Sequence, residues 1–372
     1  MSSEKKWIWQ QEKYPNFEYN FSELEKILEK IKFEQWVLSW IFKIMNIENQ
    51  ENIQLDIFTS DSLNTSIIEW EFLNRDSVRS SISNKLWIKN SKKDVSTKKT
   101  DWLTSILIDS FVNSDKKMDL ERLFWWHNSL FESWYINLRK INVAKFRWDE
   151  EMQIVSWAIW HEKVYFIAPW RDLLEREMCD FLKYLNDDSN LSIIKAWIIH
   201  LWFVVIHPFD DWNWRIARAL TDMILTRELW NSVKLYSFSK SINEWKKWYY
   251  EFLEKTSSWN LDITKWLKWF LETLLISIKD SQKNIEQIFK KTQFWDKNKN
   301  LVLNERQIKV LNKVLDIWNE DFSWWINTRK YSSITKSLKL TASRDIKDLV
   351  EKNILKKIDW TNWRNISYKI NL

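Results

Sequence analysis

The absence of glycine constrains this chain more than any other feature of its sequence. Its 372 residues contain no Gly, whereas about 26 would be expected at the usual frequency of roughly 7%. A protein of this size ordinarily uses Gly in turns and at helix C-termini, where the backbone adopts positive φ. The 3 Pro residues do not replace it as chain breakers. The literal sequence is therefore hard to fold.

Tryptophan is in excess by a comparable margin, with 30 residues. We infer that many Trp stand where the working protein has Gly. A coding sequence in which UGA codons specify Gly, but were translated as Trp, would produce this pattern, as would deliberate substitution.

The remaining composition is that of an ordinary globular protein. Hydrophobic residues make up 45% and charged residues 29% of the chain, so it can bury a core. The single Cys excludes a disulfide scaffold and a Cys-based zinc site. The start, MSSEKKWIWQQEK, has no apolar leader, and no run of 18 apolar residues follows, so we expect a soluble cytoplasmic protein with no membrane partner. The net charge of +6 permits an acidic partner without identifying one.

Hydrophobic periodicity predicts a mainly α fold. A β-hairpin is predicted at 152–168, where apolar β-formers flank a polar turn at 161–163. A short β-like tail ends the chain. Helices are predicted at 21–46, 64–84, 101–113, 119–132, 171–186, 191–206, 213–228, 261–290, 304–316, 330–337 and 341–352.

The densest group of polar residues is HPFDDWNWRIAR, from His207 to Arg218. It lies between two apolar helices, and a loop that opens a helix can bind an anion through free backbone N–H groups. Arg215 and Arg218 lie three residues apart, on one helix face, and can bind phosphate oxygens. Asp211 is a hard oxygen ligand suited to Mg²⁺. His207 can accept a proton from a hydroxyl group.

Two Trp residues conflict with this interpretation, because an indole would block the close approach of backbone and phosphate. With Gly in place of Trp212 and Trp214 the segment becomes HPFDDGNGRIAR, which resembles the Fic family signature HPFx(D/E)GN(G/K)RxxR. The resemblance implies a Fic-type helical core with a β-hairpin flap.

The resemblance also implies roles for individual residues. His207 would be the base that activates a target hydroxyl for attack on the α-phosphate of ATP, and Phe209 would anchor the loop. Asp211 would bind Mg²⁺ as the metal ligand, and Arg215 and Arg218 would contact the β- and γ-phosphates. The implied ATP- and phosphate-binding set is Asp211, Trp212, Asn213, Trp214, Arg215 and Arg218.

Similarity to the family extends outside the motif. The segment VYFIAP corresponds to the flap that docks an extended segment of the target, through Val164, Tyr165, Phe166 and Ile167. Alternatively, another part of this chain covers that edge. KKWIWQQEKYPNF resembles the N-terminal helical region of one Fic subfamily. Six Trp lie at helical or motif positions where the family also has Trp, and we interpret them as native: Trp7, Trp9, Trp126, Trp202, Trp266 and Trp269.

A possible brake precedes the core. The segment Thr65–Trp70, with Gly at position 70, resembles the family's inhibitory pattern (S/T)xxxE(G/N). A Glu69 carboxylate paired with Arg218 would occupy the guanidinium meant for the γ-phosphate, so that ATP would bind without its reactive geometry. The alternative is an ordinary surface Glu on a helix.

The C-terminal region resembles a winged helix, with 341–352 as recognition helix and 354–370 as wing. Thr341, Ser343 and Arg344 would face a DNA groove. Lysines at 347, 352, 356 and 357 could meet phosphates. Alternatively, the module mediates protein contacts or dimerisation.

These observations predict three domains: an N-terminal helical region with the inhibitory motif (1–100), a Fic catalytic core (101–290) and a winged helix-turn-helix domain (300–372). The expected function is a protein adenylyltransferase that transfers AMP from ATP, with Mg²⁺, to a Ser, Thr or Tyr hydroxyl of a target protein and is restrained by Glu69. One alternative is a Fic enzyme that transfers another phosphate-containing group or removes AMP. Another is a DNA-binding transcriptional regulator that uses the Fic core as a nucleotide sensor. DNA and a second copy of the chain are further candidate partners.

Overall fold

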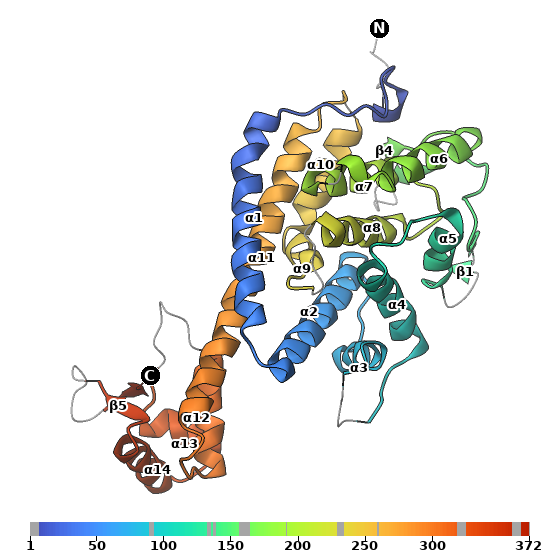
Figure 1. Ribbon diagram of the computed structural model, residues 1–372. Helices are drawn as coiled ribbons and strands as arrows, with labels where there is room; N and C mark the ends of the chain where they lie inside the picture. Colours follow the sequence, from blue (N-terminus) through green and yellow to red (C-terminus); the bar gives the residue numbers. More distant parts are fainter. Residues whose placement is uncertain are drawn as a thin grey trace. The chain divides into compact units, whose positions relative to one another are not determined.

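The computed structural model describes residues 7–88, 93–131, 135–136, 139–155, 164–190, 192–228, 234–258, 260–317, 325–358 and 366–371. The chain divides into two compact units, residues 1–281 and 282–372. Figure 1 shows that helices dominate both units, as the sequence predicts, and the hairpins contribute only short strands.

The first unit contains α1 (Phe21–Lys43), α2 (Ile47–Ile68), α3 (Arg75–Lys85), α4 (Lys98–Val112), α5 (Leu120–Asn128), α6 (Leu174–Leu185), α7 (Ile193–Ile206), α8 (Asn213–Glu228), α9 (Phe238–Glu244), α10 (Lys246–Ser257) and the first part of α11 (Thr264–Lys297). Its strands are β1 (Tyr135–Ile136), β2 (Arg139–Lys140), β3 (Gln153–Val155) and β4 (Val164–Ile167). Short 3-10 turns lie at Ile8–Gln10, Arg171–Leu173 and Asp188–Asn190.

Helix α7 forms the centre of the core. Every residue from Ile193 to Ile206 is buried, and the helix packs against α6 and α8 (Figure 1). A helix that is apolar on all sides is stable only when neighbours surround it. Trp197 stacks on Phe270 of α11, with ring centroids 4.5 Å apart. The loop of the HPFDDWNWRIAR motif, which we call the motif loop, therefore begins at the end of a helix that is buried throughout.

A buried ionic cluster joins α2 to α8. The Lys234 ammonium lies 2.8 Å from a carboxylate oxygen of Asp61 and 2.7 Å from one of Asp222. Ser237 Oγ and the backbone N–H of Ser239 also donate to Asp61. Removing one partner of such a cluster typically costs about 3–5 kcal/mol, because it leaves a buried charge unpaired. The cluster thereby sets the position of α2 relative to α8.

The prediction of one helix over 64–84 is wrong. Helix α2 ends at Ile68, and α3 begins only at Arg75. The N–H groups of residues 70 and 71 fold back onto the carbonyl oxygens of Ile67 and Ser66, at 3.0 and 2.9 Å. This is a Schellman turn, which requires a left-handed residue at the position that Trp70 occupies. The sequence shows Trp rather than Gly there, which hides the helix end.

Three Trp residues adopt the left-handed conformation in the described part of the chain. The φ angles of Trp70, Trp87 and Trp212 are 60°, 56° and 64°. Trp87 follows the end of α3, where the Ile88 N–H reaches the Ser83 carbonyl at 3.0 Å. This conformation costs a residue with a Cβ roughly 1–2 kcal/mol, a cost that Gly avoids. These angles support the hypothesis that Gly belongs at all three positions.

Four of the six Trp residues interpreted as native have a different environment from Trp70 and Trp87. Trp7, Trp126, Trp202 and Trp266 are buried. Trp70 and Trp87 expose 72% and 91% of their surface. An exposed indole contributes little burial energy to offset backbone strain.

The predicted hairpin is confirmed. β3 and β4 pair antiparallel, with Gln153 opposite Ile167 and Ile154 opposite Phe166; the predicted turn at 161–163 lies outside the described residues. The N-terminal segment covers part of the hairpin, because Trp7 packs edge-on against Phe166 and the Trp9 indole donates to the Ile167 carbonyl at 2.6 Å. At Ile167, the edge of the hairpin is therefore contacted by another part of this chain, which was the alternative to a free docking edge.

The second unit contains the end of α11, α12 (Glu305–Ile317), α13 (Thr328–Thr335) and α14 (Lys339–Glu351), followed by β5 (Leu355–Lys357) and β6 (Tyr368–Ile370). β5 and β6 pair antiparallel, and Ile326 bridges to Tyr368 of β6. The three helices pack through apolar residues that include Val310, Tyr331 and Leu349. Trp324, in the predicted turn, lies outside the described residues.

Bilayer-spanning helices need both length and apolarity, and no helix in the described ranges combines the two.

Replacing Trp87 by Gly should raise the free energy of unfolding by about 1 kcal/mol, because strain is relieved at a position that loses almost no burial. Trp248 lies within α10 and is 48% exposed. There Gly should lower the stability by about 1 kcal/mol, because a helix interior disfavours Gly. Urea unfolding of Trp87→Gly and Trp248→Gly measures both changes, and a loss of stability in Trp87→Gly would refute the conformational argument.

Candidate active site

His207 lies where α7 ends. It adopts a left-handed conformation (φ 51°, ψ 58°), and its N–H donates to the Phe203 carbonyl at 3.0 Å. Its Nδ1 lies 3.3 Å from the Val204 carbonyl, which assigns the ring proton to Nδ1 and leaves Nε2 as the acceptor. Burial lowers the pKa of His207 to about 4, despite the contact with Val204. The imidazole is therefore neutral at pH 7 and can accept a proton.

The loop after His207 is held by reciprocal bonds. The Asn213 side chain accepts from the Phe209 N–H at 3.0 Å and donates to the Phe209 carbonyl at 2.8 Å. The Phe209 ring is fully buried and stacks on His127, 4.0 Å between centroids. Asn213 thus closes the loop from within, and Phe209 anchors it to α5.

Arg147 also fixes this loop, although the sequence analysis did not single it out. Its Nε donates to the His207 carbonyl at 2.9 Å, and its backbone N–H donates to the Pro208 carbonyl at 2.9 Å. Its Nη2 donates to the carbonyl of Pro169, just after β4. Arg147 therefore connects the hairpin to the motif loop. No local pattern marks this role, because its partners are backbone oxygens far away in the sequence.

The two consecutive acids of the loop have different environments. Asp210 accepts the backbone N–H groups of Asn142 at 2.9 Å and Trp148 at 3.2 Å, which makes it structural. Within the described residues, the Asp211 carboxylate accepts only the N–H of Trp212, at 2.7 Å. Burial raises the pKa of Asp211, and the charge of Glu69 raises it further. A cation beside Asp211 would lower this pKa again and so offset the effects of burial and of Glu69.

Asp211 is suited to Mg²⁺ only together with a substrate. No cluster of three or more His, Cys, Asp or Glu side chains with metal-binding geometry occurs among the described residues. Mg²⁺ is commonly held by one or two carboxylates plus substrate phosphates. The single carboxylate and the raised pKa fit that arrangement.

Arg218 lies in α8 and pairs with the end of α2. Its Nη2 is 2.8 Å from Glu69 Oε1, and its Nε donates to Thr65 Oγ1 at 2.9 Å. Burial opposes the charge on Arg218, but Glu69 outweighs it and the pKa is raised. Its buried Nη1 atom has no hydrogen-bond partner of good geometry among the described residues. The structure therefore brings Glu69 and Arg218 together and leaves part of the guanidinium unsatisfied.

Arg215 has an equivalent arrangement, with a carboxylate that the sequence analysis missed. Its Nη2 is 2.5 Å from Glu71 Oε2, and its Nε is buried with no hydrogen-bond partner in the described part of the chain. The Trp212 ring lies against the guanidinium, 4.0 Å from its carbon to the ring centroid. The indole therefore covers one face of the Arg215 guanidinium. Trp214 packs against Tyr250, 5.0 Å between centroids.

Other predicted residues lie apart from this group. Val164, Tyr165, Phe166 and Ile167 form β4, which is connected to the motif loop through Arg147. Thr341, Ser343 and Arg344 lie on α14 in the second unit. Thr341 is half-buried, and Ser343 and Arg344 are exposed.

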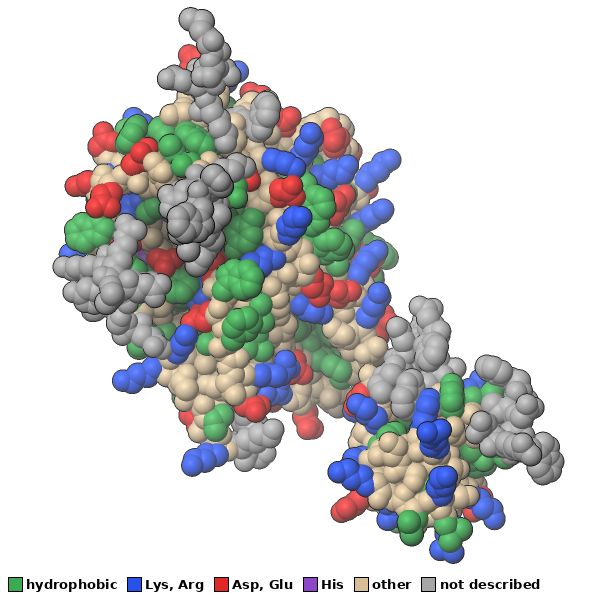
Figure 2. All heavy atoms as spheres, turned by 180° about the vertical axis from the view of Figure 1, so that it is seen from behind, with side chains coloured by type: hydrophobic (Ala, Val, Ile, Leu, Met, Phe, Trp, Pro, Cys, Tyr) green, Lys and Arg blue, Asp and Glu red, His purple; other side chains and the backbone are tan. Residues whose placement is uncertain are grey.

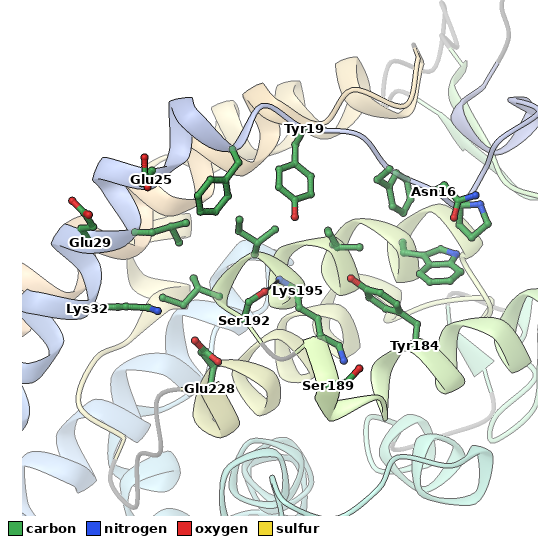
Figure 3. A pocket seen from close by; sticks show the side chains of 18 residues that line it. Asn16, Tyr19, Glu25, Glu29, Lys32, Tyr184, Ser189, Ser192, Lys195 and Glu228 are labelled. Atoms are coloured by element: carbon green, nitrogen blue, oxygen red, sulfur yellow. Dashed lines mark hydrogen bonds between the residues drawn. The ribbon is translucent and has the colours of Figure 1, made fainter.

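A cavity of about 860 Å³ lies elsewhere in the first unit. Figure 3 shows side chains of α1, the segment before it, the end of α6 and the start of α7 around this cavity. They include Tyr19, Lys32, Tyr184 and Lys195, and none of the 18 lining residues belongs to the motif.

The buried histidines predict how stability depends on pH. Burial lowers the pKa of His127 to about 3 and of His207 to about 4, and it lowers the pKa of His200 well below its usual value. Histidines in the unfolded chain have a pKa of about 6.5. As the pH falls below 7, the unfolded chain therefore binds more protons at these histidines than the folded chain does. The free energy of unfolding should therefore fall between pH 7 and 5, by up to about 2 kcal/mol per histidine.

Urea unfolding at several pH values measures this slope. Asp222, whose pKa burial raises to about 6, opposes part of it. His127→Gln should give a shallower slope, and constant stability over this range would contradict the assignment of neutral buried histidines.

Comparison with known proteins agrees with this geometry. Residues 7–88 match a domain of unknown function, DUF4172, and residues 117–225 match the Fic/DOC family. Over 64 residues the chain is 36% identical to protein adenylyltransferase fic-1 of Caenorhabditis briggsae, a match that spans 16% of this chain and 12% of that protein.

Solved structures share the fold. A Fic family protein from Desulfovibrio desulfuricans G20 superposes with a TM-score of 0.50 at 13% identity, over 93% of this chain and 95% of that one. A Fic domain containing signaling protein from Bacteroides thetaiotaomicron VPI-5482 gives 0.52 at 14% identity, over 70% and 97%. The predicted mainly α, Fic-type fold is confirmed. The chain is a Fic/DOC family protein with an N-terminal DUF4172 domain.

Proposed function

We propose that the protein transfers AMP from ATP to a Ser, Thr or Tyr hydroxyl of a target protein. The observation that carries the proposal is the pair of buried guanidinium groups on α8, each with a nitrogen that lacks a well-formed hydrogen bond to the described residues, on the helix that follows the loop of the neutral His207. Buried N–H donors without partners favour the binding of an anion whose oxygens can accept hydrogen bonds from both Arg215 and Arg218. A triphosphate presents such acceptors on adjacent groups.

The proposed reaction uses His207 as general base. Its Nε2 takes the proton of the target hydroxyl as the hydroxyl oxygen attacks the α-phosphorus. A new P–O bond forms to the target, the bond between the α- and β-phosphates breaks, and pyrophosphate leaves. The contact between Nδ1 and Val204 keeps Nε2 unprotonated before the reaction.

Arg215 and Arg218 would bind the β- and γ-phosphates, and Asn213 would keep the loop closed around them. Asp211 would hold Mg²⁺ between its carboxylate and the phosphates. Bound Mg²⁺ would neutralise charge that develops on the leaving pyrophosphate. The chain itself supplies the base, the phosphate contacts and the rigid loop.

Glu69 acts in this proposal as a brake. Its carboxylate occupies Arg218 at 2.8 Å, where a γ-phosphate would otherwise bind. ATP can then bind only in a geometry that leaves the α-phosphate misplaced for attack. Replacing Glu69 by an uncharged residue frees Arg218 for the nucleotide.

The β4 edge is the proposed dock for an extended segment of the target. Trp9 already donates to the Ile167 carbonyl, so a docking segment must displace this indole or leave Ile167 unpaired. Arg147 connects this edge to His207 and thereby fixes the distance between docked chain and base.

Label transfer from α-labelled ATP with Mg²⁺ tests the proposal. Because the Trp212 indole covers Arg215, the informative protein has Trp70, Trp87, Trp212 and Trp214 replaced by Gly; we refer to it as the glycine variant. We expect the glycine variant to label itself or added protein, and the literal Trp chain to label far less. Glu69→Gly in the glycine variant should raise labelling at least tenfold.

His207→Ala is the control for chemistry and should abolish labelling, since no other described His lies in the loop. Loss of label after chelation of Mg²⁺ is also expected. Absence of transfer in both the glycine variant and its Glu69→Gly form would contradict the enzyme and favour a nucleotide sensor. Label from a β-phosphate, but not from an α-phosphate, would indicate transfer of a different group.

A second proposed activity, duplex DNA binding, rests on α14. We propose that the second unit is a winged helix in which α14 enters the groove and the β5–β6 hairpin forms the wing. Ser343, Arg344 and Lys347 are exposed on α14. Figure 2 shows Lys and Arg side chains over the surface of this unit. Such a face can contact base edges and phosphates.

Binding to mixed-sequence duplex DNA at several salt concentrations tests this second proposal. Affinity should fall with salt, and Arg344→Ala should weaken it about tenfold or reduce the salt slope by about 1. Lys313→Ala, which removes an exposed cation from α12, is the charge-matched control and should change binding less. No binding at low salt, or equal effects of both substitutions, would favour a protein-contact module instead.

A further inference from the structure

The turn that ends α2 places two carboxylates on two arginines. Glu69 and Glu71 flank Trp70, whose left-handed backbone reverses the chain. The Glu71 N–H is fixed to the Ser66 carbonyl at 2.9 Å. Glu69 reaches Arg218 and Glu71 reaches Arg215, so one helix end covers both guanidinium groups.

Glu71 is held from both sides. Its Oε2 lies 2.5 Å from Arg215 Nη2, and its Oε1 contacts the Lys99 ammonium near the start of α4. The side chain of Arg215 is 5% exposed, that of Glu71 17% and that of Lys99 45%. Burial raises the pKa of Glu71, but Arg215 and Lys99 outweigh it and lower the pKa. The carboxylate is therefore ionised at neutral pH and bridges two cations.

We propose that Glu71 is a second gate of the nucleotide site, which acts on Arg215 as Glu69 acts on Arg218, and that Lys99 anchors this gate. The proposal rests on the proposed function, in which Arg215 binds a phosphate. A carboxylate oxygen and a phosphate oxygen compete for the same N–H donor, so Glu71 must leave before Arg215 can bind the nucleotide through Nη2 as well as Nε. Lys99 stabilises the closed position because it pairs with the other carboxylate oxygen.

Two consequences distinguish this gate from a single brake. Removing the Glu69 side chain frees only Arg218, so freeing both arginines by substitution requires a change at Glu71 as well. Because Glu69 and Glu71 flank one turn, a movement of that turn would release both arginines together. The gate also discriminates among nucleotides, since it competes only with a phosphate beyond the α-position.

Nucleotide affinity tests the gate without requiring transfer. The protein is the glycine variant carrying His207→Ala, and calorimetry gives the Kd for ATP and for AMP. Glu71→Gln should tighten ATP binding at least tenfold and leave AMP binding unchanged within twofold. Lys99→Met should also tighten ATP binding, but by less, because Glu71 keeps its contact with Arg215.

The double variant shows whether Lys99 acts through Glu71. Lys99→Met should add nothing once Glu71→Gln is present, because its partner is gone. Lys98→Met, an exposed neighbour on α4, should leave both affinities unchanged. A fold-change far below tenfold for Glu71→Gln, or equal tightening of AMP, would overturn the gate.

Weaker ATP binding in Lys99→Met would overturn the anchor role and make Lys99 a phosphate ligand. These outcomes are separable from failure of the proposed function, which would show as ATP binding without label transfer when His207 is present. Absence of ATP binding in every variant would also overturn the gate, since removal of the Glu71 charge would then not have made Arg215 available to the nucleotide.

Discussion

The buried cluster of Asp61, Lys234 and Asp222 is the interaction on which the site depends. It fixes α2 against α8 with a single ammonium between two carboxylates, at 2.8 and 2.7 Å. Asp61 lies two helical turns before Glu69, and Asp222 lies one turn after Arg218. The cluster therefore sets the register in which the end of α2 meets the phosphate-binding face of α8. Without this register, the carboxylates of the turn would not reach the arginines.

Much of the local structure could be predicted because it follows from short-range patterns. The helix predicted at 213–228 coincides with α8, and the loop from His207 to Asn213 lies between two helices as expected. The contact of Glu69 with Arg218 could be anticipated from a resemblance to a known motif. Periodicity alone would not have provided it, since the two residues lie 149 positions apart.

The features that could not be predicted depend on contacts between distant segments. Arg147, Glu71 and Lys99 acquire their roles from partners on other elements, and nothing near them in the sequence marks those partners. The helix end at Ile68 was missed for a different reason. A helix end of this kind is normally marked in the sequence by a Gly or Asn that tolerates positive φ, but position 70 is Trp. Backbone geometry thus recovers information that the residue letter conceals.

The carboxylates at the arginines also have a structural consequence. A buried guanidinium without an anion is costly. Even with Glu69 and Glu71 in place, Arg215 and Arg218 each keep a nitrogen that no described residue satisfies. An empty phosphate site built from such residues needs substitute anions in order to fold. Glu69 and Glu71 supply them from the turn that ends α2, where both side chains are only partly buried. Inhibition and stability then have one physical origin: the anion that stabilises the empty site is the one that the nucleotide must displace. Replacing Glu69 or Glu71 by an uncharged residue should accordingly lower the free energy of unfolding of the nucleotide-free protein. Nucleotide binding should restore that free energy.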